Sequence, residues 1–153
     1  MKRGAAALLR AVANVIVKRP ETFDMGHWLR HEPYTTPTKK TPTPYCGTTA
    51  CLAGHVVLLL GVSPTVTPSY IQSHTLPEKL QRRGHHVYTL EDIARDALGL
   101  TGQQARGLFY HTHWPTKFRT AFEQMSDLDS RHALREQARI ARRRVLYFLR
   151  TGQ

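Results

Sequence analysis

The sequence has few cysteines and no apolar run long enough to cross a membrane. Cys46 and Cys51 are its two cysteines, and without a secretory signal they indicate reduced thiols in a cytoplasm. Arg10 and Asn14 interrupt the apolar N-terminal stretch, which favours an amphipathic helix over a signal peptide. The most apolar run, within residues 46–61, is shorter than the roughly 20 residues that a transmembrane helix needs. We therefore expect a cytoplasmic protein without a transmembrane segment.

Acidic residues are also scarce. Eleven aspartates and glutamates stand against 22 lysines and arginines, which gives a formal net charge of +11 and an isoelectric point near 10.3. This excess favours an anionic partner, such as nucleic acid, a nucleotide, an anionic membrane or an acidic host protein. A host with generally arginine-rich proteins would produce the same excess without any anionic ligand. Because the sequence lacks common signatures such as a zinc finger or an RRM, nucleic-acid binding should be non-specific and salt-sensitive.

The hydrophobic pattern predicts one all-α domain over residues 1–153, with five to seven helices. The 41% hydrophobic content suffices for one modest core, and no internal repeat of solenoid type is present. Two segments rich in proline, 30–45 and 62–86, are expected to be loops, with a short helix over Pro77–Arg83 in the second. The oligomeric state is left open. Helical segments are expected over 4–18, 20–25, 48–60, 89–98, 101–109, from Pro115 onward, and from 126–129 to 150. The spacings Thr89-x-x-Asp92 and Thr101-x-x-Gln104 predict a capping box at the start of two of them.

The predicted fold is organised around a buried central helix over about 48–60. Thr48 or Thr49 can cap its first turn, and Gly61 stands where a left-handed residue commonly ends a helix. Nearly every side chain between them is apolar, which indicates burial on most sides. A buried strand over Val56–Leu60 is the alternative, because short apolar runs are ambiguous.

Two cysteines and a histidine at the start of this helix form a possible zinc site. Cys46, Cys51 and His55 follow a C-x4-C-x3-H spacing, and zinc accepts cysteine and histidine ligands tetrahedrally. The alternative is that Cys51 is a small core residue and His55 forms a hydrogen bond inside the fold. A fourth ligand could come from one of three other histidines, His27, His111 or His113.

Cys46 is also a candidate catalytic nucleophile. A thiol at a helix N-terminus is activated by the free backbone N–H groups and the helix dipole. The same turn, Cys46–Thr49, could bind a phosphate instead, because Gly47 permits close approach. A histidine base for Cys46 could come from His111 or His113, but nothing in the sequence orients either one. An ordinary capped helix start is the simpler interpretation.

Arginines on the last helix are the main candidates for binding an anion. They recur at helical spacing and could follow a phosphate backbone, with Lys39 and Lys40 of the first proline-rich loop in support. A solvated helix face is the alternative. The predicted basic stripe is Arg131, Arg135, Arg139 and Arg142, with Arg143 and Arg144 beside it. The predicted buried stripe is Leu134, Ala138, Ala141, Val145 and Leu149.

The order of short motifs resembles a group of small proteins of unknown function from bacteriophages and actinobacteria. The motifs are Pro20-Glu21-x-Phe23-x-Met25-x-x-Trp28, Cys46-Gly47-Thr48-x-x-Cys51-x-Ala53-Gly54, Ala97-Leu98-Gly99-Leu100, Gln104-Ala105, Leu108-Phe109 and Trp114-Pro115-x-x-Phe118. This resemblance implies an accessory protein of a phage or mobile element in a bacterial host cell, and it implies no catalytic residue.

We therefore expect a non-enzymatic basic protein that binds an anionic partner. A thiol-dependent enzyme using Cys46 and a small zinc-stabilised interaction protein are the two alternatives. Under the first alternative no substrate can be named, and under the second the zinc would support the fold.

Overall fold

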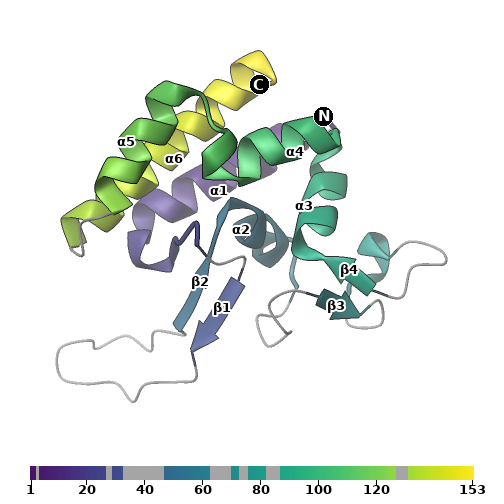
Figure 1. Cartoon of the computed structure of the whole chain (residues 1–153). Helices are drawn as coiled ribbons and strands as arrows, with labels where there is room; N and C mark the ends of the chain where they lie inside the picture. Colours follow the sequence, from purple (N-terminus) through teal and green to yellow (C-terminus); the bar gives the residue numbers. More distant parts are fainter. Residues whose placement is uncertain are drawn as a thin grey trace.

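Six α-helices form the body of the described structure. The computed structural model describes residues 1–2, 4–26, 29–32, 47–62, 70–72, 76–81, 87–126 and 131–153 (Figure 1). The predicted all-α fold with five to seven helices is confirmed. The helices are α1 (Ala5–Lys18), α2 (Leu52–Leu59), α3 (Leu90–Leu98), α4 (Gly102–Phe109), α5 (Thr116–Ser126) and α6 (Arg131–Thr151). Short elements are η1 (Pro20–Thr22), β1 (Leu29–Glu32), β2 (Gly47–Ala50), β3 (Tyr70–Gln72), η3 (Glu78–Leu80), β4 (Val87–Thr89) and η4 (His111–His113).

The first and last helices lie side by side and run in opposite directions (Figure 1). α1 buries Leu9, Val12 and Ile16, which recur every three or four residues and so share one face. α6 packs against both α1 and α5, while α2 packs between α1 and α3. This arrangement encloses one continuous apolar core. Within the described ranges, no helix combines the length and the apolar character needed to cross a membrane.

The central helix starts later than predicted. Gly47–Ala50 is extended and forms β2, paired antiparallel with β1 in a register that places Leu29 opposite Ala50. Helix α2 begins at Leu52, so the prediction of a helix from about residue 48 with a threonine cap is wrong. β-branched Thr48 and Thr49 favour extended backbone, and the partner strand satisfies that preference.

The body and end of α2 agree with the prediction. Its residues Leu52–Val57 are all buried, as expected for a helix that is apolar all round. Gly61 adopts a left-handed φ of +86° just beyond the helix. The alternative of a strand over Val56–Leu60 is wrong, because the helix covers residues 52–59.

Large parts of the two proline-rich segments lie outside the described residues. Residues 33–46, which include Lys39, Lys40 and Cys46, are outside the described residues. In the second segment the residues outside are 63–69, 73–75 and 82–86. The described remainder departs from the prediction of loops at β1, which contains residues 30–32, and at β3, which pairs antiparallel with β4. Residues 78–80 form η3, within the short helix predicted for Pro77–Arg83.

The starts of α3 and α4 follow the local sequence. The Thr89 hydroxyl accepts a hydrogen bond from the Asp92 N–H at 3.0 Å and caps α3. At α4, the Gln104 N–H donates to the Thr101 hydroxyl, and the Thr101 N–H donates to the Gln104 side-chain oxygen. This reciprocal pair is the predicted capping box.

Candidate functional site

Cys51 occupies the N-cap position of α2 and is 3% exposed. Burial raises the pKa of its thiol to about 11, against the opposing effect of hydrogen bonds from nearby backbone N–H groups. The thiol is therefore protonated at neutral pH, whereas a reactive cysteine needs a lowered pKa. Cys51 thus matches the predicted small core residue. The nucleophile prediction concerned Cys46, which lies outside the described residues.

His55 is held inside the fold by a backbone partner. Its Nε2 lies 3.0 Å from the carbonyl oxygen of Thr22 in η1, and a carbonyl oxygen can only accept. The Nε2 atom therefore carries the proton in the neutral ring. The ring also stacks against Phe23, with the centroids 6.5 Å apart. These contacts match the predicted structural role of His55.

The predicted zinc site is only partly covered by the structure. Among the described residues there is no group of three or more histidine, cysteine, aspartate or glutamate side chains placed to hold a metal ion. Cys46 and His27 lie outside the described residues, so the zinc site stays a prediction. The predicted phosphate site at Cys46–Thr49 is wrong in its structural premise, because residues 47–50 form a paired strand rather than a helix start.

The internal position of His55 predicts a pH-dependent stability. Burial lowers its pKa below the value of 6.5 that we take for the unfolded chain. Between the folded pKa and 6.5 the unfolded chain binds more protons, so the free energy of unfolding falls as the pH decreases through this range. The slope contributed by one group reaches at most about 1.4 kcal/mol per pH unit.

Urea unfolding of the wild type and of His55→Gln at several values between about pH 7 and pH 5 checks this prediction. Glutamine keeps a donor for the Thr22 carbonyl but does not titrate, so the variant should lose stability less steeply on acidification. Equal slopes in the two proteins would show that His55 does not cause the effect.

Five exposed arginines line one side of α6, and we call them the arginine face. They are Arg131, Arg135, Arg139, Arg142 and Arg143, all exposed as predicted. Within the described residues, Glu136 is the acidic partner of this face, and it forms an ion pair with Arg139. The predicted buried stripe of α6 is confirmed at Ala138, Ala141 and Val145. It is wrong at Leu134, which is 37% exposed.

The arginine face does not favour the stability of α6 itself. Arg131, Arg135 and Arg139 follow one another at i, i+4 spacing, and like charges at that spacing repel by about 0.2–0.5 kcal/mol per pair. Arg131 also begins the helix, whose first turn contains no acidic residue, although a helix N-terminus disfavours cations. The charges are thus placed where an anion from outside the chain would relieve their repulsion.

A shallow groove of about 350 Å³ lies beside this face, where α1 meets α6. Val17 of α1 lines it together with Glu136 and three members of the arginine face, Arg139, Arg142 and Arg143. The groove brings an apolar surface and three guanidinium groups to one place. It gives the arginine face a recess in which an anionic group could sit.

Arg144 is not beside the arginine face, and that part of the prediction is wrong. Its side chain is fully buried. Nη1 donates to the main-chain oxygen of Gln153 at 2.7 Å, and Nη2 donates to the carbonyl oxygen of Gly107 in α4. Burial lowers the pKa of Arg144 to about 10, so the guanidinium is charged at neutral pH.

The helical position of Arg144 could have revealed its burial. It lies four residues after Ile140 and four before Phe148, and both of these are buried. Residues at i, i+4 share a face of a helix. The prediction places Arg144 beside Arg143 because of its residue type, whereas its helical position belongs to the opposite face.

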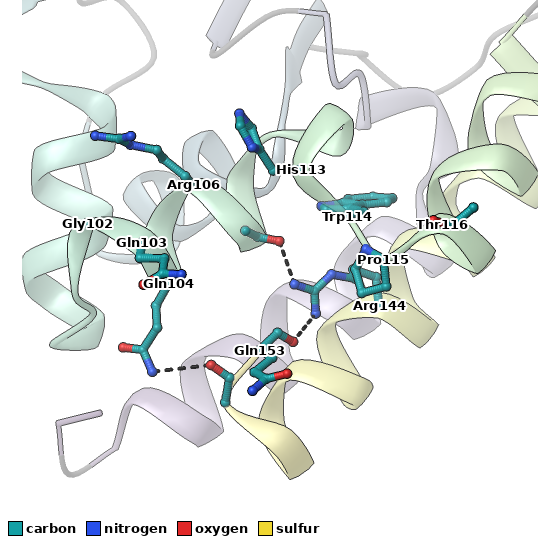
Figure 2. A pocket seen from close by; sticks show the side chains of 12 residues that line it. Gly102, Gln103, Gln104, Arg106, His113, Trp114, Pro115, Thr116, Arg144 and Gln153 are labelled. Atoms are coloured by element: carbon teal, nitrogen blue, oxygen red, sulfur yellow. Dashed lines mark hydrogen bonds between the residues drawn. The ribbon is translucent and has the colours of Figure 1, made fainter.

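The guanidinium of Arg144 lies in the wall of a cavity with a volume of about 1020 Å³ (Figure 2). The cavity lies between α4, the turn before α5 and the end of α6. Trp114 closes one side and is fixed by a hydrogen bond from its Nε1 to the Leu108 carbonyl oxygen at 3.0 Å. The lining residues are Gly102, Gln103, Gln104, Arg106, Gly107, His113, Trp114, Pro115, Thr116, Arg144, Gly152 and Gln153.

No protein-family model, curated protein sequence or solved structure significantly matches this chain. The resemblance to phage and actinobacterial proteins therefore stays a prediction from the sequence motifs.

Proposed function

We propose that this protein is a non-enzymatic binding protein whose arginine face on α6 contacts a polyanion, and that nucleic acid is the partner. The observation that carries the proposal is the exposure of five arginines on one side of a single helix. From Arg131 to Arg143 the helix rises about 18 Å, at 1.5 Å per residue. Successive phosphates of one DNA strand are spaced by about 3.4 Å along the duplex axis, so this length spans about five phosphates.

Extended charge of this kind fits a nucleic-acid backbone better than it fits a single nucleotide. A mononucleotide would occupy only part of an 18 Å row, and the groove beside Val17 adjoins only the part of that row from Arg139 to Arg143. Arginine binds phosphate through a planar fork of donors, and such contacts carry no sequence information. Binding should therefore tolerate any sequence.

The cellular setting is part of the same proposal. The motif order resembles proteins of phages and actinobacteria, and an accessory role in the cytoplasm of a bacterial host is consistent with a strongly basic chain. A protein with these properties would coat or bridge nucleic acid rather than read it. No contact with a base edge is required for that role.

Salt dependence of binding to a random-sequence DNA duplex tests the proposal. The logarithm of the association constant should fall linearly with the logarithm of salt concentration from about 50 to 200 mM, with a slope near −0.9 per phosphate contacted and thus no steeper than roughly −4.5. Fluorescence anisotropy of labelled duplex gives the measurement. Polyglutamate is the comparison, because equal affinity for it would identify an acidic protein as the partner and reject nucleic acid.

A further inference from the structure

Two aromatic rings meet at the surface between α5 and α6, and a lysine lies over them. Phe118 of α5 and Tyr147 of α6 are both partly exposed, with ring centroids 5.5 Å apart and planes inclined by 55°. The two helices pack side by side (Figure 1). The Nζ of Lys117 lies 4.4 Å from the Tyr147 centroid and 5.1 Å from the Phe118 centroid. We call Phe118 and Tyr147 the aromatic pair.

The aromatic pair continues the arginine face along α6. Tyr147 follows Arg143 by four residues, and residues at i, i+4 lie on the same side of a helix. At 1.5 Å per residue, about 6 Å of helix axis separates the two residues. Because successive phosphates of a strand are spaced by about 3.4 Å, a strand held by the arginine face reaches the rings within about two nucleotides.

The core of the protein does not account for the position of Tyr147. Its neighbour Phe148 is buried in the core, whereas Tyr147 packs against Phe118 at the rim and stays partly exposed. The buried guanidinium of Arg144 lies 5.9 Å from the Tyr147 centroid and supports the ring from within the fold. Aromatic rings placed beside a row of cations are typical of proteins that bind single-stranded nucleic acid, because unpaired bases stack on the rings.

Given the polyanion contact proposed above, on which this step rests, we infer that the preferred partner is a single strand, one base of which stacks on the aromatic pair. The base takes the place of the Lys117 ammonium over the rings. Lys117 is exposed and its stem is flexible, so the ammonium can move to a neighbouring phosphate. Stacking of a base is stronger than the contact of an exposed ammonium with a ring, so the exchange is favourable.

A duplex binds without the aromatic pair. Its bases are paired and stacked on one another, so its phosphates contact the arginine face while the bases stay out of reach of the rings. Lys117 then keeps its position over the rings. Single-stranded and double-stranded nucleic acid therefore share the arginine face, and the single strand gains the stacking contact in addition. Stacking tolerates any sequence, because every base has a π-face.

An abasic strand isolates the contribution of the bases. The probe is a labelled oligothymidylate of about 12 nucleotides, within the range of single-strand site sizes. Its control is a strand of abasic sugar phosphates with the same length and charge. In fluorescence anisotropy at about 50 mM salt, the wild type should bind oligothymidylate at least about fivefold more tightly than the abasic strand.

Variants of Tyr147 assign this preference to the ring. Tyr147→Leu keeps an apolar side chain but removes the ring, and should reduce the preference for oligothymidylate to nearly one. Tyr147→Phe keeps the ring and should keep the preference. Both variants leave the arginine face intact, so their affinity for the abasic strand should equal that of the wild type. This affinity serves as the check that each variant is folded.

The outcomes separate the stacking contact from the proposed function. If the wild type binds neither strand nor the duplex, the proposed function fails and the stacking contact with it. Equal affinity for the two strands, or a preference that survives in Tyr147→Leu, overturns the stacking contact and leaves the arginine face as a nucleic-acid site. Oligouridylate of the same length distinguishes the two sources of single strands. Tighter binding of oligothymidylate identifies DNA as the partner, and tighter binding of oligouridylate identifies RNA.

Discussion

Replacing Arg135, Arg139 and Arg142 together by glutamate is expected to abolish the binding of a DNA duplex at about 100 mM salt. Each substitution removes a cation from the arginine face and adds an anion that repels phosphate. Each phosphate contact releases about one counterion, and this release drives binding. Losing three of five contacts should therefore lower the affinity by on the order of a hundredfold or more. Anisotropy titrations of the triple variant and the wild type measure this loss directly.

The matched control replaces three cations outside α6 by glutamate, so the net charge changes by the same amount. Lys2→Glu, Arg106→Glu and Lys117→Glu alter three exposed cations near the N-terminus, on α4 and on α5. If the arginine face is the site, this control should retain most of the affinity, with only a small loss from the lower net charge. Equal losses in the two triple variants would show that net charge, rather than the arginine face, drives binding.

Phe23→Ala is expected to lower the free energy of unfolding by about 3–5 kcal/mol. Phe23 is 2% exposed, and its ring contacts His55 of α2 and Phe122 of α5, with centroids 6.5 and 6.4 Å apart. Truncation would leave a cavity between three segments that meet at this ring. Because domains of this kind are stable by only about 5–15 kcal/mol in total, urea unfolding should show a large shift of the midpoint.

Two comparison variants separate the loss of packing from other effects. Phe23→Leu keeps most of the apolar volume and should cost clearly less than the alanine variant. Phe118→Ala removes a ring of the same size that is only partly buried, so its cost should also be smaller. A cost for Phe23→Ala below that for Phe118→Ala would contradict the central position assigned to Phe23.

The features that the sequence predicted well are those set by neighbouring residues. The capping box of Thr101 and Gln104 needs only the residues of one helical turn. The left-handed Gly61 ends α2 because glycine has no Cβ penalty there. The exposure of the arginine face likewise follows from helical periodicity, since charged side chains avoid the buried stripe.

The features that the sequence missed depend on distant partners. Residues 47–50 form a strand because β1 lies beside them, and nothing within the segment specifies that partner. The cavity at Arg144 is built from α4, the turn before α5 and the end of α6, which are separate in sequence. Arg144 itself could have been placed from its helical position, but arginine is almost never fully buried, and its residue type misled the interpretation.

The pairing of the first and last helices has a consequence for synthesis on the ribosome. The apolar face of α1, formed by Leu9, Val12 and Ile16, is among the first parts of the chain to emerge. Its main cover, α6, is translated more than a hundred residues later. At about 5–20 residues per second, the face stays without that cover for roughly five seconds or longer. Nascent chains should therefore be prone to association with one another until translation of α6 is complete.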